Sequence, residues 1–133
     1  MDVEKALKSF FQNNDEQFGA IPAAKIVTWA ENCKVARDLN KSTTATQLRR
    51  FYDAIRSIWD TPDQKKLDGN NNLKEEYLAR LIFLKPAFVG AANKNKIGDE
   101  FKNIMCLSID RVKNKEDFYK FIKFFEAIIQ YSK

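Results

Sequence analysis

Apolar residues recur at helical spacing along almost the whole chain, and this feature limits the fold more than any other. The clearest run follows the i, i+3, i+4, i+7 pattern of one buried helix face: Leu48, Phe51, Tyr52, Ile55, Ile58 and Trp59. Only 4 Gly and 3 Pro interrupt the 133 residues, too few for the turns of an all-β fold. We therefore predict an all-α protein, a compact bundle of five to six helices in a single domain over residues 1–133.

Capping and helix-breaking residues set the expected boundaries. Thr44 and Gln47 have the spacing of a capping box, and Pro62 ends the helix that follows. Asn114 with Asp117 caps the last helix in a similar way. In chain order, we expect helices over about 3–12, 22–39, 44–59, 73–92 and 99–112, and a sixth after residue 114.

The segment from Leu73 to Ala92 is apolar nearly all round its helix axis. This pattern is typical of a helix at the centre of a bundle. Pro86 is expected to kink it near residues 82–85, because proline lacks the N–H of a helical hydrogen bond. Residues 63–72 are the most polar run and are predicted to form a mobile loop.

Two absences exclude most catalytic chemistry. The chain has no His, which removes Ser–His and Cys–His catalysis and His metal sites. Cys33 and Cys106 lie 73 positions apart, so neither belongs to a CxxC motif, and both fall on apolar helix faces as core thiols. We expect no enzyme activity, no metal and no cofactor.

The hydropathy of the chain argues against a membrane. The longest unbroken apolar stretch, Leu81 to Leu84, is far shorter than the roughly 20 residues that span a bilayer. The first five residues carry charges where a signal peptide has an apolar region. We expect a cytoplasmic protein without a membrane partner.

Basic residues gather in two acid-free windows of a chain whose net charge is +5. The first window, residues 39–52, holds Lys41, Arg49 and Arg50. Arg49 and Arg56 are two helical turns apart and point the same way, yet Asp53 is spaced to pair with both. An ion-pair ladder and an anion-binding face are equally consistent with this spacing. Arg50 has no such acid and is the better binding candidate.

The second window, residues 77–98, contains Lys85, Lys94 and Lys96 among its cations. The lysines at 94 and 96 alternate with asparagines after an apolar helix. Cations and Asn are favoured at helix C-termini, so capping and anion binding both remain open here.

The last helix is rich in aromatic residues. Most of its phenylalanines lie at core spacing. Phe124 and Tyr131 are seven positions apart and off the main apolar stripe, so they are predicted to form a contact surface for a partner helix.

Three segments together resemble a known family. Residues 44–52, Thr-Ala-Thr-Gln-Leu-Arg-Arg-Phe-Tyr, are similar to its Thr/Ser-rich cap followed by Gln-hydrophobic-Arg-basic-aromatic. The Leu-Lys-Pro helix from residue 84 to Lys94, and the Phe-Glu-Ala-hydrophobic helix over residues 121–133, complete the likeness in the same order. The family is the small subunit of type III-A CRISPR effector complexes, the Csm complexes. The first 40 residues show no match.

This resemblance implies a non-catalytic, all-α subunit in antiviral defence that stacks in several copies. It would line the groove for the guide RNA–target RNA duplex and touch the target strand. The implied partners are these RNAs, the repeating backbone subunit, the large polymerase-like subunit and other copies of itself. Target cutting belongs to the other subunits.

The resemblance carries over position by position. Arg49 and Arg50 match the family's Arg and the basic residue after it, and Lys94 stands where the family usually has Arg. Gly90 stands where the family often has Tyr. We predict sequence-independent contacts with RNA phosphates from four first-rank residues, with three second-rank candidates: Arg49, Arg50, Lys94 and Lys96, then Lys41, Arg56 and Lys85.

A second hypothesis assigns no nucleic-acid role to the chain. In this hypothesis it is a helical protein-interaction or scaffold module that binds its partner through Phe124 and Tyr131. Such binding would be insensitive to salt and to changes at Arg49 and Arg50.

Overall fold

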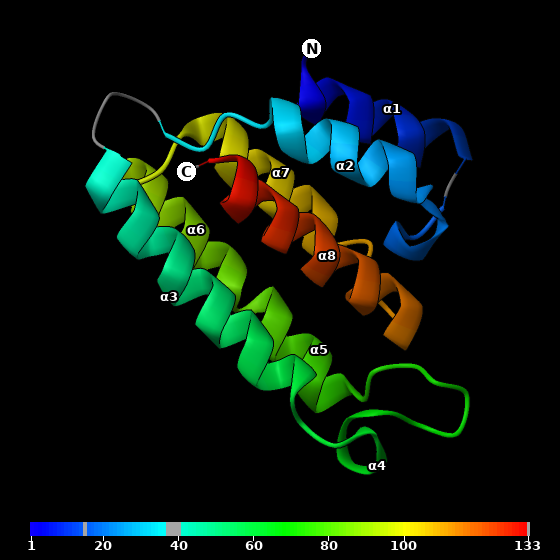
Figure 1. The fold of residues 1–133 in the computed structure, drawn as a ribbon. Helices are drawn as coiled ribbons and strands as arrows, with labels where there is room; N and C mark the ends of the chain where they lie inside the picture. Colours follow the sequence, from blue (N-terminus) through cyan, green and yellow to red (C-terminus); the bar gives the residue numbers. More distant parts are fainter. Residues whose placement is uncertain (15, 37–40, 133) are drawn as a thin grey trace.

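The computed structural model describes residues 1–14, 16–36 and 41–132, of which the side chains of residue 14 and residues 41–43 lie outside the description. Its helices pack against one another in a bundle (Figure 1). In chain order they are α1 (Val3–Asn14), the 3-10 helix η1 (Phe18–Ala20), α2 (Ala23–Asn32), α3 (Lys41–Trp59), α4 (Asp63–Lys66), α5 (Glu75–Ile82), α6 (Leu84–Asn93), α7 (Asp99–Ile109) and α8 (Lys115–Tyr131).

The all-α class is confirmed, but the number of helices exceeds the prediction. Seven of the α-helices in the described ranges have eight or more residues, and α4 is a single turn. The additional helix arises because the segment predicted as one kinked helix divides at Phe83 into α5 and α6. Pro86 has no N–H for the carbonyl of Ile82, and its ring crowds that carbonyl, so the helix cannot continue unbroken.

The central helix is α8, which packs against η1, α2 and α3, while α7 packs against α1 and α6 (Figure 1). The prediction that the 73–92 segment lies at the centre is wrong. Ile82, Phe83 and Val89 on its outer side are 50%, 72% and 41% exposed. The neighbouring helices cover only part of the apolar surface of this segment. The aromatic core instead forms around α8. Fully buried rings there include Phe18, Phe88, Phe101, Phe118, Phe121, Phe124 and Phe125.

The start of α8 carries the predicted cap. The Asn114 side chain accepts a hydrogen bond from the Asp117 N–H at 2.8 Å, and Asp117 accepts one in return from the Asn114 N–H. Asp117 is only 2% exposed and also accepts from the N–H groups of Lys113 and Gly19. A Cβ on Gly19 would lie 2.6 Å from the Asp117 carboxylate, so only glycine permits this approach.

Two predictions about the middle of the chain are wrong. Helix α2 ends at Asn32, because the backbone is already extended at Cys33, while Leu39 lies outside the described residues. Beyond the helix, the Val35 carbonyl accepts a hydrogen bond from the Gly98 N–H at 2.7 Å. Thr44 does not cap α3, which begins three residues earlier.

The two cysteines are free and partly buried against the core. Burial raises the pKa of Cys33 to about 12, with a smaller contribution from the Glu100 carboxylate. Burial also raises the pKa of Cys106. Both thiols are therefore held in their neutral form, as expected of core residues.

Residues 63–72, predicted as a polar loop, contain the helical turn α4 and a hydrogen-bonded turn. Lys66 is 3% exposed and donates to the carbonyls of Trp59 and Thr61, with Asp63 at 3.2 Å from its Nζ. The Asp68 carboxylate accepts from two backbone N–H groups within the following turn. Polar side chains here satisfy backbone groups, which composition alone does not reveal.

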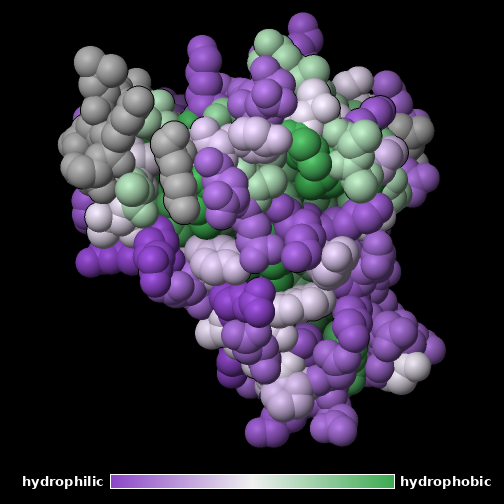
Figure 2. All heavy atoms as spheres, viewed as in Figure 1, coloured by the Kyte–Doolittle hydropathy of each residue, from purple (hydrophilic) through white to green (hydrophobic). Residues whose placement is uncertain are grey.

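One face of the molecule is mainly polar. On the face that Figure 2 shows, hydrophilic residues predominate and hydrophobic ones appear as patches between them. Of the helices described, none is both long and apolar enough to cross a membrane.

Candidate nucleic-acid interface

Arg49 and Arg50 lie on the exposed side of α3, opposite the buried residues that the helical pattern predicted. The Arg49 Nε lies 3.8 Å from the Asp53 carboxylate, and the two side chains are 82% and 65% exposed. Arg50 has no ion pair among the described residues. Both arginines line a hollow of about 540 Å³ against Ile129 and Ser132 near the end of α8. Sequence reasoning did not place Ile129 and Ser132 beside the arginines, because spacing within one helix does not show which helices meet.

Lys94 and Lys96 belong to the turn that ends α6. Asn95 has a positive φ of 58°, its N–H bonds to the Ala92 carbonyl, and the Lys96 N–H bonds to the Ala91 carbonyl at 2.9 Å. This is the Schellman arrangement, so the capping interpretation of the turn is confirmed. Neither lysine side chain has an acidic partner in the part of the chain that the structure describes. Capping of α6 therefore uses backbone groups and neither of the two ammonium groups.

Thr44 connects this turn to α3. Its hydroxyl donates to the Lys96 carbonyl at 3.1 Å, across 52 positions of sequence. A second hollow, lined by Val35, Thr44 and Ser132 among others, joins the same region to the end of α8. The start of α3, the end of α6 and the end of α8 consequently lie at one end of the bundle, at the upper left of Figure 1.

The second-rank residues are placed differently. Arg56 lies 3.1 Å from Asp60 and 3.9 Å from Glu126, rather than pairing with Asp53. Lys85, at the start of α6, is 2.6 Å from Asp110. Each of these two cations thus forms an ion pair that is shorter than the one between Arg49 and Asp53. The side chain of Lys41 lies outside the described residues.

A polar contact holds α3 against α8 below the exposed arginines. The Tyr52 hydroxyl donates to the Glu126 carboxylate at 2.7 Å. Burial and this carboxylate together raise the pKa of Tyr52, so the phenol remains a donor at neutral pH. This contact adds a polar link to the buried apolar face that holds α3 in the bundle.

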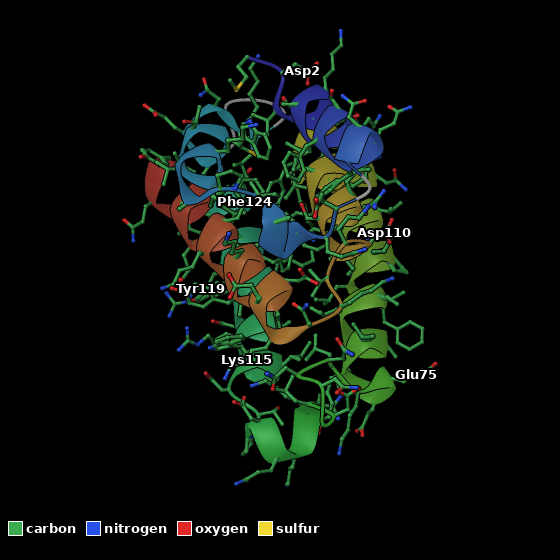
Figure 3. All side chains as sticks on the ribbon, turned by 90° about the vertical axis from the view of Figure 1, so that its right-hand side faces the viewer. Asp2, Glu75, Asp110, Lys115, Tyr119 and Phe124 are labelled. Carbon is green, nitrogen blue, oxygen red and sulfur yellow. The ribbon has the colours of Figure 1, made fainter. Side chains whose placement is uncertain are left out.

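The two predicted protein-contact residues do not share a surface. Phe124 is 0% exposed and packs on Phe18 of η1, 5.7 Å between ring centroids, so its assignment as a contact residue is wrong. Figure 3 shows it on the side of α8 that faces α2 and η1. The buried apolar stripe of α8 is wider than predicted because both α2 and η1 cover the helix on that side. Tyr131 remains 49% exposed.

Gly90, the position that departs from the family pattern, lies on an open side of α6. A Cβ there would meet no atom within 4 Å, so local packing does not require glycine. Among the residues described, no three Cys, Asp or Glu side chains are grouped so as to hold a metal ion.

The chain matches one family description. The profile of the family described as Csm2 Type III-A matches residues 21–133, which extends the resemblance upstream through α2. No curated protein and no solved structure matches the chain. Since the match covers most of the 133 residues, the chain belongs to the Csm2 family, the small subunit of the type III-A CRISPR effector (Csm) complex.

Proposed function

We propose that this Csm2 chain binds the RNA backbone inside the complex without reading sequence. The observation that carries the proposal is the gathering at one end of the bundle of three cations, Arg50, Lys94 and Lys96, that have no acidic partner among the described residues. There the chain would line the groove for the guide RNA–target RNA duplex. Phosphate contacts hold RNA in position, and base pairing supplies specificity in a guide-programmed complex.

Arg49 can join this surface with little loss of free energy. Exposed ion pairs contribute roughly 0.2–1 kcal/mol, and the 3.8 Å pair with Asp53 lies in solvent. Breaking the pair between Arg49 and Asp53 to bind a phosphate therefore costs little free energy. Lys94 attracts phosphate as a point charge but lacks the bidentate fork of arginine. Arg56 and Lys85 must give up shorter contacts, so we expect smaller contributions from them.

The test is a titration of a 40-nucleotide single-stranded RNA across a salt series. Four phosphate contacts predict a log–log salt slope of about −2.8, at roughly −0.7 per contact. Replacing both arginines (Arg49→Glu/Arg50→Glu) should weaken binding and reduce the slope by about 1.4, with circular dichroism confirming the fold.

A matched control carries the same charge change elsewhere. Lys5→Glu/Lys8→Glu alters two exposed residues of α1. If this control weakens RNA binding as much as the arginine variant does, net charge and not a defined surface explains the binding. Unchanged affinity and unchanged complex assembly in the arginine variant would refute the proposal.

One observation favours the second hypothesis, a protein-contact role. Tyr131 is half exposed and follows Ile129, which lines the hollow beside Arg49 and Arg50. A partner bound there would be lost in Tyr131→Ser at any salt concentration. Co-purification of this variant with the backbone subunit, the large subunit and other copies of the chain tests that role separately from RNA binding.

A further inference from the structure

A separate hollow of about 570 Å³ lies at the start of α8, between the end of α3 and the turn at residues 70–71. Figure 3 shows two residues of its wall, Lys115 and Tyr119, on neighbouring turns of α8. This volume falls in the range of small-ligand sites. The four cations of the proposed backbone surface do not line it.

Aromatic rings form one wall. Trp59 and Tyr119 lie 6.1 Å apart between ring centroids at 45°. Trp59 is fixed by an edge contact to Phe118 at 5.4 Å and by the Lys66 ammonium 5.0 Å from its ring. Tyr119 is 44% exposed. The wall therefore combines a rigid indole with an accessible phenol ring on which a planar group can stack.

Amide side chains form the opposite wall. Those of Asn70 and Asn71 have no hydrogen-bond partner in the described structure. Their turn is nevertheless held in place, because the Lys115 N–H donates to the Asn71 carbonyl at 2.9 Å and Asp68 accepts from the Asn70 N–H. The Asn114 amide also lines the hollow and uses its oxygen for the α8 cap. The exposed amide groups of Asn70 and Asn71 are thus presented to solvent on a hydrogen-bonded backbone.

The charges at the hollow largely cancel. The Lys115 ammonium is 2.6 Å from Asp63, and Glu116 adds a carboxylate at the rim. Outside the hollow, the Lys123 ammonium lies 5.6 Å from the Tyr119 ring and 3.4 Å from Glu126. Among the described residues that line the hollow, the one cation, Lys115, is already paired with Asp63, so a neutral heterocycle with polar edges suits the hollow better than a phosphate.

We propose that this hollow binds an unpaired nucleobase of single-stranded RNA, stacked on Tyr119, with its polar edge hydrogen-bonded by the amides of Asn70 and Asn71. The inference rests on the proposed function, because the backbone surface would bring the strand to the protein. Stacking on an aromatic ring tolerates every base, so such a site is compatible with sequence-independent binding. A free nucleotide presents the same base for stacking and hydrogen bonding. The test distinguishes a base within RNA from the base of a free nucleotide.

The test is photo-crosslinking of the full chain with a 20-nucleotide RNA that carries one 4-thiouridine. Trypsin releases residues 116–120, with Tyr119, as one peptide and residues 67–74, with both asparagines, as another. We expect crosslinks on these two peptides. Tyr119→Leu should reduce their yield roughly tenfold, whereas Phe83→Leu, which alters a more exposed ring at the junction of α5 and α6, should not.

The probes and variants distinguish the nucleobase site from the backbone-binding surface. Arg49→Glu/Arg50→Glu should lower the total yield and leave the crosslinked peptides the same. Labelling of the two peptides by 4-thiouridine monophosphate as well as by RNA supports base recognition with a free nucleotide as a further source, whereas labelling by the nucleotide alone overturns the assignment to RNA. Equal yields in wild type and Tyr119→Leu, or crosslinks confined to other peptides, overturn the nucleobase site whether or not the backbone surface binds RNA.

Discussion

Replacing Asp117 with alanine removes the carboxylate that joins η1 to the start of α8. Asp117 accepts hydrogen bonds from the N–H groups of Gly19 at 2.7 Å, Lys113 at 3.0 Å and Asn114 at 3.2 Å. All three bonds are part-buried, and the first one spans 98 positions of sequence. Alanine would leave these donors without an acceptor in a place where water has limited access.

The expected loss is large for a single side chain. A hydrogen bond to a charged group contributes about 1.5–3 kcal/mol, and partial access to water lowers this figure for each donor. Counting roughly 1–1.3 kcal/mol for each of three bonds, we expect Asp117→Ala to destabilise the fold by about 3–4 kcal/mol. That is a substantial fraction of the roughly 5–15 kcal/mol that stabilises a typical domain.

Urea denaturation followed by circular dichroism measures this loss. With a slope near 2 kcal/mol per molar urea, the midpoint should fall by about 1.5–2 M. The matched control is Glu75→Ala, an exposed acid in the first turn of α5, where only the helix dipole is affected, by about 0.3–1 kcal/mol. A loss below about 1 kcal/mol for Asp117→Ala, or one equal to that of the control, would refute the reasoning.

Two more predictions concern titratable groups. Burial, aided by Asp2, raises the pKa of Glu100, and a carboxyl group whose pKa is higher in the folded state destabilises the fold once pH exceeds that value. Glu100→Gln should therefore raise the urea midpoint at pH 7 and have no such benefit at pH 3; equal gains at both would contradict this assignment. The pKa of Cys33 is near 12 in the folded protein, against an ordinary value of 9.0. Cys33 should therefore react with iodoacetamide at pH 8 about a thousandfold more slowly in the native protein than in urea. Mass spectrometry of the labelled peptide measures this difference in rate.

Helical periodicity predicted most of the fold because burial of one helix face dominates the energy of a bundle. The stripe from Leu48 to Trp59 and the cap at Asn114 are found as predicted. Predictions from periodicity were wrong where tertiary contacts determine where a helix ends or which residues are buried. Cys33 continues an apolar stripe, yet the chain leaves the helix there, and the next residues form a hydrogen bond to Gly98. Phe124 lies off the main stripe, yet η1 covers it.

The candidate site was only partly visible in the sequence. The spacing of acids predicts no ion pair for Arg50 within its own helix, and none is found among the described residues, whereas its role in binding stays a prediction. Pairs between distant segments do not follow from spacing, so the engagement of Lys85 by Asp110 could not be predicted. The role of Thr44 was also hidden, because its hydroxyl bonds to a carbonyl 52 positions away instead of its own helix.

The central place of α8 has a consequence for synthesis of the chain on the ribosome. Phe18 of η1 packs on Phe121 and Phe124, and the N–H of Gly19 is satisfied by Asp117. These partners are translated about 100 residues later, at roughly 5–20 residues per second. For several seconds the nascent η1 and α2 therefore have no core to join. Folding of this subunit is expected to follow translation of α8, with the early apolar segments exposed to chaperones until then.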